Sequence, residues 1–274
     1  MKIKKYAGKI SIVGRPNVGK STLMNKLIKK KISIVTNKKN TTTDLLLGIH
    51  TTVSHQFIYI DTPGIEINQK KYFKKIQHAI LQSKLIIFVT DNIFWNKDDQ
   101  WIFQLIYNTK IPFIFVLNKI DKLKNKEIIL SYIKKIKYIK NIIPISTKKK
   151  KDIKIIFNFI KNMIPSSQHI FEKNIFTDKD IKFSISEIIR EKFMIHLNKE
   201  LPYTFQVKIE SFNLHSNNEY YIKSYILVKN ERYKKIMIGI NGKKIKKCSI
   251  QSRIDIKKIL KKKIHLFLWI KINK

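Results

Sequence analysis

The chain has 274 residues, enough for one large domain or two smaller ones, and a formal net charge of +38. Cys248 is the only cysteine, the histidines lack metal-ligand spacing, and no apolar run approaches the ~20 residues of a membrane span, which argues against a disulfide-stabilised fold, a zinc site and a transmembrane helix. The charge predicts salt-sensitive affinity for nucleic acid, but lysine is spread over the whole chain, so the charge alone locates no binding site.

The first informative stretch is a phosphate-binding pattern near the N-terminus. The pattern G-x-x-x-x-G-K-[ST] is matched by consecutive residues: Gly14, Arg15, Pro16, Asn17, Val18, Gly19, Lys20 and Ser21. Residues 10–13 predict a short buried strand before it, and residues 22–30 predict an amphipathic helix after it. In that setting backbone N–H groups and the helix dipole bind phosphate oxygens, with Lys20 on the β- and γ-phosphates and Ser21 on Mg²⁺. We assign Lys20 and Asn17 to charge stabilisation during phosphoryl transfer. Arg15 is either a cation acting in cis or, as is more usual, an exposed side chain.

A metal-binding pattern follows a predicted hairpin. Residues 45–49 and 57–60 predict neighbouring strands, and the second leads into Asp61, Thr62, Pro63 and Gly64. An Asp at the carboxyl end of a buried strand can hold Mg²⁺ through water, and the N–H of Gly64 can face a γ-phosphate. Taken alone, this tetrapeptide is a common turn, so it indicates a metal site only together with the phosphate-binding pattern before it.

The middle of the chain predicts alternating helices and strands. Helices are expected at 70–83, 98–107 and 153–163, and buried strands at 85–89, 111–117 and 142–147. This alternation indicates a mostly parallel sheet with helices on both faces and a ligand at the carboxyl ends of the strands.

A base-recognition pattern ends one of these strands. Asn118, Lys119 and Asp121 form N-K-x-D. The Asp121 carboxylate can accept both N–H donors on the Watson–Crick edge of guanine, whereas adenine has no matching donor pair, and such pockets reject a mismatched analogue by roughly 10⁴–10⁵-fold. Asn118 would contact the imidazole side of the base, the Lys119 stem would cover the ring, and the amides of Ser146 and Thr147 would meet the guanine carbonyl. The predicted ligands are therefore GTP and GDP with Mg²⁺.

The residue after Gly64 bears on the rate of hydrolysis. Many GTPases have a Gln there that orients the attacking water, and this chain has Ile65, which cannot hydrogen-bond water. We count Ile65 among the GTP-binding residues and expect slow intrinsic hydrolysis, near or below ~10⁻⁴ s⁻¹.

The last third of the chain predicts a different fold. A polar, aperiodic stretch at 165–179 reads as a linker. Helices are expected at 187–198, 232–238 and 243–260, and strands at 204–212, 220–228 and 264–272. A helix–G-x-x-G–helix unit on a three-stranded sheet is the core of a KH domain, whose loop clamps the backbone of about four nucleotides. The alternative is a helix–turn–helix corner with a solvated lysine face. The expected RNA-binding residues are Gly239, Ile240, Asn241, Gly242, Lys243, Lys244 and Lys246.

The sequence resembles the Era family of bacterial GTPases over nearly its whole length. The stretches that carry the resemblance are Gly14–Ser21, Gly48–Thr51, Asp61–Gly64, Trp95 with Asp98 and Asp99, Asn118–Asp121, Glu187–Lys192, Glu200–Tyr203, Ile238 and Gly239 with Gly242, Lys244–Lys246, His265 with Leu266, and Leu268 with Trp269.

The resemblance implies a P-loop GTPase domain at 1–166, a linker at 167–180 and an α+β type II KH domain at 181–274. It also implies binding to the 3′ end of 16S rRNA, a role in assembly of the small (30S) ribosomal subunit, a cytoplasmic monomer, and a peripheral contact with anionic membrane on the inner face. The alternative function is an RNA-binding module with a vestigial, non-hydrolysing nucleotide domain.

Two departures from the family pattern concern the nucleotide site. Where the family usually has Thr-Thr-Arg, this chain has three threonines and then Asp44; we place the Mg²⁺-contacting hydroxyl at Thr42, with Thr41 and Thr43 as alternatives. Residues 148–151 are all lysine where the family commonly has a Gly-containing turn, so we expect a looser loop beside the base and a basic run that lies in solvent.

Overall fold

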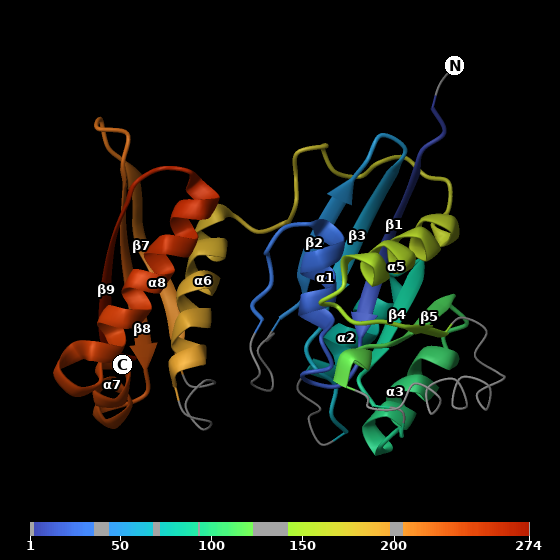
Figure 1. Ribbon diagram of the computed structural model, residues 1–274, viewed down its shortest axis with the longest axis horizontal. Coiled ribbons are helices and arrows are strands. Elements are labelled where there is room, and N and C mark those ends of the chain that lie inside the picture. The colour runs from blue at the N-terminus through green and yellow to red at the C-terminus, as the bar shows by residue number, and fades with distance from the viewer. Residues whose placement is uncertain are drawn as a thin grey trace. The chain divides into compact units, whose positions relative to one another are not determined.

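The computed structural model describes residues 3–35, 44–67, 72–92, 94–122, 142–197 and 205–273. The chain divides into two compact units, Met1–Ser33 with Thr42–Asp178 (unit 1) and Ile34–Thr41 with Lys179–Lys274 (unit 2) (Figure 1). No helix among the described residues is long and apolar enough to cross a lipid bilayer.

Unit 1 is built on a six-stranded sheet in the order β2-β3-β1-β4-β5-β6. Its strands are β1 (Tyr6–Val13), β2 (Leu46–Thr51), β3 (His55–Asp61), β4 (Leu85–Thr90), β5 (Phe113–Leu117) and β6 (Ile142–Pro144). All neighbours pair in parallel except β2 and β3, which form the predicted hairpin. Every residue of β3 and β4 is buried, as expected for strands covered on both faces.

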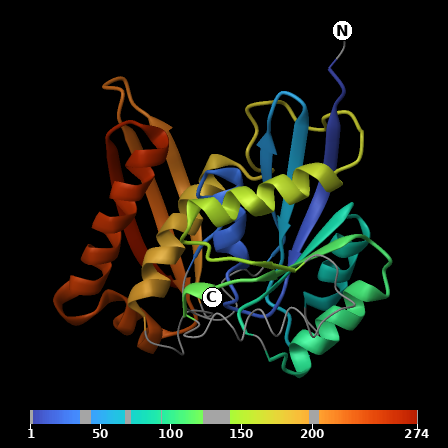
Figure 2. The same ribbon diagram turned by 45° about the vertical axis from the view of Figure 1, so that its right-hand side comes forward.

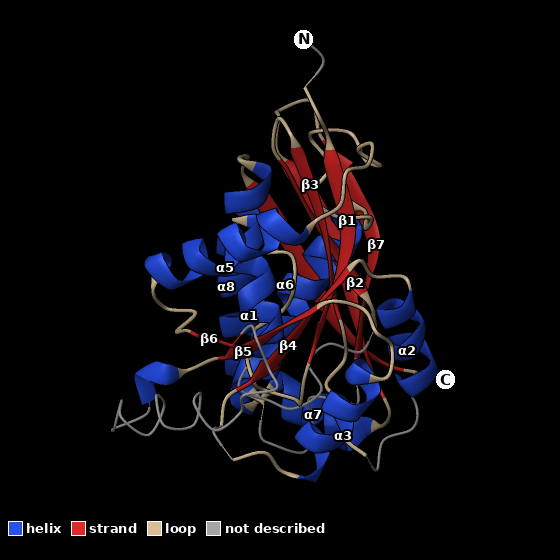
Figure 3. Cartoon of the chain, turned by 90° about the vertical axis from the view of Figure 1, so that its right-hand side faces the viewer, coloured by secondary structure: helices blue, strands red, loops and turns tan. Residues whose placement is uncertain are grey.

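Helices cover both faces of this sheet. They are α1 (Lys20–Ile28), α2 (Phe73–Leu81), α3 (Lys97–Tyr107) and α5 (Lys150–Met163), with a short 3₁₀ turn η2 (Ile120–Lys122) after β5. Figure 3 shows α2 and α5 on opposite sides of the strands. One core cluster joins Ile76 and Ile80 of α2 and Ile102 of α3 to Ile86 and Phe88 of β4. The predicted mostly parallel sheet is confirmed, and its strands' carboxyl ends carry the residues of the candidate site.

The stretch after α5 is hydrogen-bonded to unit 1, although most of it falls in the predicted linker. Pro165 accepts a hydrogen bond from the Ala7 N–H at 3.3 Å, and Phe176 accepts one from the Ile49 N–H at 2.8 Å. Between them the fully buried Gln56 side chain bonds to the backbone of Ile170 and Phe171. These contacts satisfy backbone groups beside β1, β2 and β3.

Unit 2 packs helices on one face of a three-stranded sheet in the order β7-β8-β9. Its elements are α6 (Ile181–His196), β7 (Gln206–Leu214), β8 (Tyr220–Val228), α7 (Glu231–Ile238), the 3₁₀ turn η3 (Ile240–Gly242), α8 (Lys243–Leu260) and β9 (Ile264–Ile272). Strand β8 is antiparallel to β7 and parallel to β9. Figure 2 shows α6 and α8 on one face of this sheet, as an α+β KH domain requires.

The core of unit 2 lies between the sheet and its helices. Ile222 and Ile226 of β8 share a cluster with Ile189 and Phe193 of α6 and with Cys248 of α8. Burial raises the pKa of the Cys248 thiol to about 11, so this cysteine is a packing residue and stays protonated at neutral pH.

Candidate nucleotide site and RNA-binding loop

The phosphate loop takes its shape from residues with positive φ. Gly14 has φ +154°, and a Cβ there would collide with the carbonyl oxygen of Val89. Asn17 and Gly19 have φ values of 64° and 102°, and the second leads directly into α1. A side chain at Gly19 would collide with the Asn118 amide. The loop therefore reaches the N-terminus of α1 along the path that phosphate binding requires, with its backbone close to β4 and to the loop after β5.

Lys20 lies across this loop. Its Nζ donates to the carbonyl oxygens of Gly14 at 3.0 Å and Arg15 at 2.8 Å, and its side chain is almost fully buried. Burial lowers the pKa of Lys20 to about 8, against the opposing effect of Asp61. A phosphate beside the amine would favour its charged form.

This lowered pKa predicts pH-dependent nucleotide binding. Below about pH 7 the amine is protonated before and after binding, so affinity should not change with pH through this group. Above a pKa of about 8 the free protein has lost the proton and the complex regains it, so affinity should fall by up to about tenfold per pH unit. Calorimetric titration with GDP in two buffers of different ionisation heat should show proton uptake near pH 8.5 and none near pH 6.5. If GDP affinity were the same near pH 6.5 and pH 8.5, and binding took up no proton near pH 8.5, Lys20 would not be the amine that binds phosphate.

The metal-binding residues meet at the end of β3. Asp61 is fully buried, and its Oδ2 accepts a hydrogen bond from the Ser21 hydroxyl at 2.6 Å. Carboxylate and hydroxyl oxygens are suitable for Mg²⁺, which keeps several waters and needs few protein ligands. The Ser21 hydroxyl and the Asp61 carboxylate therefore form a pair that fits Mg²⁺ at the end of β3. Thr42, with Thr41 and Thr43, lies outside the described residues.

Ser33 is a member of this group that the sequence analysis missed. Its hydroxyl donates to the same Asp61 oxygen at 2.8 Å. Asn25 of α1 holds it there, because the Asn25 Oδ1 accepts hydrogen bonds from the backbone N–H groups of Ile32 and Ser33. Asp61 thus accepts two hydroxyl donors, one from α1 and one from the segment after it.

The residues after Asp61 pack against the phosphate loop. The Thr62 hydroxyl donates to the Ile12 carbonyl at 2.8 Å, which ties β3 to β1. A Cβ on Gly64 would lie 2.6–2.7 Å from Pro16 atoms, so only glycine permits this approach. Ile65 donates its backbone N–H to the Gly14 carbonyl at 3.2 Å, while its side chain lies in the core beside α2. Only the backbone of Ile65 is therefore available at the phosphate site.

Asn118 joins three loops of the base pocket. Its N–H donates to the Thr90 carbonyl at 2.7 Å. Its side-chain amide donates to the Val18 carbonyl at 2.8 Å and accepts from the Thr147 N–H at 3.2 Å. The residue expected on the base is thus hydrogen-bonded to the phosphate loop and to the loop after β6.

Asp121 is held as a carboxylate. The Ser146 hydroxyl donates to its Oδ1 at 2.6 Å and the Lys148 amine to its Oδ2 at 2.7 Å. These hydrogen bonds lower the pKa of Asp121 to about 2, and the bond from Lys148 has the largest effect. The group is therefore ionised at neutral pH, as acceptance of two guanine N–H donors requires.

The contacts of Lys148 and Lys149 correct the expectation of a looser loop beside the base. Lys148 is paired with Asp121 although its side chain is 75% exposed, and Lys150 begins α5. The Ser146 carbonyl accepts the Lys149 N–H at 2.9 Å, so the loop is tied down as well. The four lysines are all exposed, as expected, but the loop is not loose, and Lys148 gives Asp121 a cationic neighbour.

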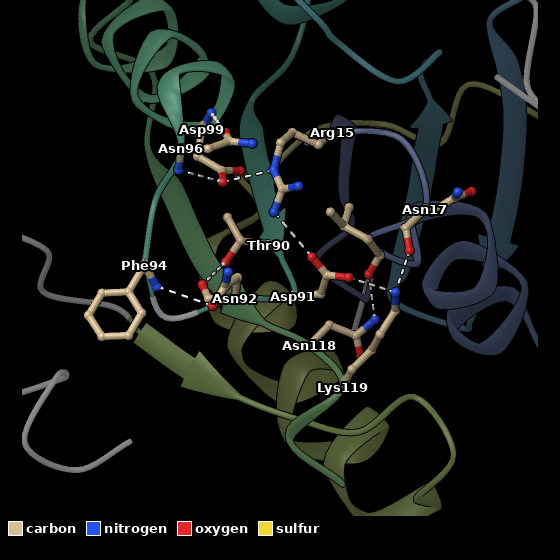
Figure 4. A network of polar contacts seen from close by, with 12 residues as sticks. Arg15, Asn17, Thr90, Asp91, Asn92, Phe94, Asn96, Asp99, Asn118 and Lys119 are labelled. Carbon is tan, nitrogen blue, oxygen red and sulfur yellow. Dashed lines mark hydrogen bonds and ion pairs between the residues drawn. The ribbon is translucent and has the colours of Figure 1, made fainter. Parts of the chain in front are cut away.

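Asp91 connects the phosphate loop to the base pocket (Figure 4). Its carboxylate forms ion pairs with Arg15 at 3.2 Å and with Lys119 at 2.7 Å. The Lys119 amine also donates to the Asn17 carbonyl at 2.5 Å. The stem of Lys119 is thereby fixed beside the phosphate loop, in the position expected to cover the guanine ring.

Arg15 is bound on its other side by α3. Its Nε lies 2.8 Å from Oδ2 of Asp99, a fully buried residue. Asp99 and Asn96 form a capping box at the start of α3, and burial raises the pKa of Asp99. The Arg15 side chain is only 20% exposed, so the expectation of a solvent-exposed arginine is wrong. The guanidinium is thus paired with two carboxylates, one on each side.

Asp91 and Asp99 were absent from the expected site, although local signals for both exist. Asp91 follows β4 directly, as Asn118 follows β5, and Asp61 is the last residue of β3. Polar residues after neighbouring parallel strands converge at one edge of a sheet. Asn96 and Asp99 have the three-residue spacing of a capping box.

The G-x-x-G loop of unit 2 is a tight turn between α7 and α8. Gly239, Asn241 and Gly242 have φ values of 75°, 47° and 69°. A Cβ on Gly239 would lie 2.7 Å from that of Lys244, and Ile240 at the tip is 82% exposed. The backbone is therefore open to close approach by a ligand, as the KH prediction requires.

The lysines of this loop differ in their availability. Lys243 and Lys246 are exposed. Lys244 is half-buried, and its amine donates to the Ile236 carbonyl at 2.9 Å, near the C-terminus of α7. Lys244 thus supports the loop, and the exposed pair is better placed to meet phosphates.

Comparison with known proteins agrees with both halves of this description. Residues 9–119 match the family model described as 50S ribosome-binding GTPase, and residues 200–274 match the KH domain model. GTPase Era of Buchnera aphidicola subsp. Schizaphis graminum is 48% identical over 278 residues, covering 99% of this chain and 98% of that protein. GTPase Era of Pasteurella multocida is 40% identical, covering 98% and 91%.

Solved structures cover both units. The crystal structure of Era with MgGDPNP and nucleotides 1506–1542 of 16S ribosomal RNA superposes with a TM-score of 0.91 at 31% identity, covering 98% of this chain and 94% of that one. A variant of Aquifex aeolicus Era bound to GDP and aluminium fluoride gives the same values.

Proposed function

This chain belongs to the Era family of GTPases, and from that premise we propose that it is a GTP-hydrolysing switch that binds the 3′ region of 16S rRNA and assists assembly of the small ribosomal subunit. The observation that carries the proposal is the ionised Asp121, fixed by Ser146 in the same pocket as the Asn118 link to the phosphate loop. These contacts support a pocket that accepts guanine by its edge, with its phosphates at the N-terminus of α1.

Each residue of the site has a definable task in the reaction. Loop amides and Lys20 bind the phosphates and stabilise charge that develops on them, and Asn17 presents its backbone in a left-handed turn of the same loop. Ser21 and Asp61 would hold Mg²⁺, which neutralises charge on the β- and γ-phosphates when bound. The Ile65 side chain is buried in the core and orients no water, which supports a slow intrinsic rate.

The RNA half of the proposal rests on the loop of unit 2. The exposed Gly239–Gly242 turn and its two exposed lysines fit a sugar-phosphate backbone. The relative with the same architecture was crystallised with nucleotides 1506–1542 of 16S rRNA. We extend the proposal to the 30S subunit as partner, to a cytoplasmic monomer, and to a salt-sensitive peripheral contact with anionic membrane.

The rival function, a non-hydrolysing nucleotide domain attached to an RNA-binding module, finds little support. Lys20, Ser21, Asp61 and Asp121 are all retained, with the contacts that an active site needs. A phosphate-release assay with small subunits separates the two functions.

A crosslinking map on small subunits tests the RNA assignment. Crosslinks are expected at the 3′ end of 16S rRNA, and their yield should differ between GTP and GDP, because γ-phosphate contacts order switch segments. The double substitution Ile240→Asp and Asn241→Asp adds two negative charges at the loop tip and should abolish these crosslinks while GTP binding is retained. Crosslinks that are unchanged in this variant, or that map elsewhere, would contradict the assignment.

A further inference from the structure

The sheet of unit 2 has a second face that its helices do not use. Along β8 and β9 alternate residues point away from the core, among them Tyr221 and Tyr225 on β8 and Phe267 and Trp269 on β9. With His265 these residues form what we call the outer-face aromatic platform. Phe267 and Trp269 remain 43% and 42% exposed, which is high for large aromatic side chains.

Four rings of the platform form a ladder with small angles between their planes, and Tyr225 is tilted by 42° against Trp269 at 5.7 Å. The Tyr221 and His265 rings are 4.3 Å apart at 20°, Tyr221 and Phe267 are 6.4 Å apart at 22°, and Phe267 and Trp269 are 6.2 Å apart at 18°. Cross-strand aromatic pairs stabilise a sheet, which accounts for the pairing. It does not account for two adjacent rings left exposed, a feature more typical of a binding surface.

Positive charge is interleaved with these rings. Lys223 lies between Tyr221 and Tyr225 on β8 and is exposed, as is Lys208 on β7. Lys271 places its amine 3.4 Å from the centre of the Tyr225 ring. A polyanion with flat, stackable groups is complementary to such a surface.

The carboxylates beside the platform are already engaged. Glu210 accepts the Tyr225 hydroxyl at 2.6 Å. Glu219 accepts from His265 at 2.6 Å and is paired with Lys263 at 2.8 Å. Each of these carboxylates thus has a partner within unit 2, and the exposed Lys208 and Lys223 add positive charge on the same face.

We propose that the outer-face aromatic platform is a second RNA-binding surface, on which single-stranded nucleotides flanking the segment held by the Gly239–Gly242 loop stack on Phe267 and Trp269. This inference rests on the proposed function, because it assigns a path to the same RNA. The loop joins α7 and α8 on the helical face of the sheet, so the two surfaces contact different nucleotides. Stacking accepts any base, and the platform should therefore add affinity with little sequence preference.

The test compares pairs of substitutions at Phe267 and Trp269 in the full-length protein with GTP and Mg²⁺. The probe is an unstructured, adenine-rich RNA of about 30 nucleotides, longer than the roughly 4–16 nucleotides that one single-strand-binding fold covers. The Leu pair (Phe267→Leu with Trp269→Leu) keeps apolar surface but removes the ring faces, the Tyr pair keeps the rings, and the Ala pair removes both. The substitutions Ile155→Ala and Phe159→Ala on α5, which remove side chains of similar exposure, are the matched control.

The Leu and Ala pairs should each weaken RNA binding by roughly 5- to 150-fold per stacked ring, while the Tyr pair and the α5 control bind like the wild type. Unchanged thermal unfolding and GTP affinity would show that the variants are folded. Wild-type affinity in the Leu and Ala pairs would overturn the inference, and the proposed function would stand if the Ile240→Asp, Asn241→Asp variant still lost RNA binding. Absence of binding of this RNA by the wild type would overturn the inference alone, because the crosslinking map on small subunits tests the proposed function independently.

Two other results would assign the platform to a different occupant and so overturn the inference. The first is that the Ala pair loses binding to phosphatidylglycerol vesicles while the Leu pair keeps both vesicle and RNA binding. The second is a change of sedimentation from dimer to monomer in the Ala pair with RNA affinity unchanged, which would make the face an interface between copies of the chain.

Discussion

Asp121→Asn is expected to lower the affinity for GTP by roughly 10⁴-fold and to make xanthosine triphosphate the preferred ligand. The carboxylate accepts two N–H donors from guanine, and an amide replaces one acceptor by a donor that faces the guanine amine. Xanthine carries a carbonyl at that position, so the Asn side chain pairs with it correctly. The Ser146 hydroxyl still has an oxygen to donate to in the variant, whereas the charge that Lys148 pairs with is removed.

The measurement is a competition titration of both nucleotides against a fluorescent guanine nucleotide. Asp98→Asn is the control, since Asp98 accepts a backbone N–H from Ile67 at 2.9 Å outside the base pocket. Its preference should remain that of the wild type. A variant at Asp121 that still preferred GTP would remove the assignment of base recognition to this residue.

Lys20→Ala is expected to reduce both GTP affinity and the single-turnover hydrolysis rate, the latter by about 10²–10³-fold. The amine donates to two phosphate-loop carbonyls, and its removal leaves those of Gly14 and Arg15 without this donor. The lost carbonyl contacts should also lower the free energy of unfolding by about 1–3 kcal/mol if water does not replace the amine.

Lys26→Ala is the control that separates a direct contact of Lys20 with phosphate from the loss of one positive charge on α1. Lys26 is exposed on α1, the same helix that Lys20 begins, so the control changes the net charge equally. It should leave binding and hydrolysis within about twofold of the wild type and unfolding within about 0.5 kcal/mol. Equal losses in both variants would mean that Lys20 acts through overall charge and does not contact the phosphates.

Regular elements with strong local signals were predictable from the sequence. The bounds of α8 and β9 agree with the prediction at both ends, because apolar periodicity and the flanking Gly242 define them. Helix α6 begins at Ile181, six residues before the predicted start at Glu187. Asp180 caps it by accepting the Phe183 N–H at 2.7 Å, a signal that is present in the sequence but hard to separate from the polar stretch around it.

The candidate site was predictable where its members lie within one motif. Lys20, Ser21, Asp61 and Asp121 were predicted in this way. Asp99 and Ser33 contact site residues that lie far away in the sequence, and local spacing does not encode which loops meet at the edge of the sheet. The ion pair of Arg15 with Asp99 illustrates this, since it required α3 to be placed beside the phosphate loop.

The Asn118 amide, hydrogen-bonded at once to the Val18 carbonyl and the Thr147 N–H, ties the loops around the nucleobase site to one another through contacts within the protein. Preorganisation of this kind spares a ligand the entropy of ordering the loops around it. Discrimination between purines should therefore persist in molecules stripped of their phosphate tail, with guanosine itself favoured over adenosine, however weakly either nucleoside is held.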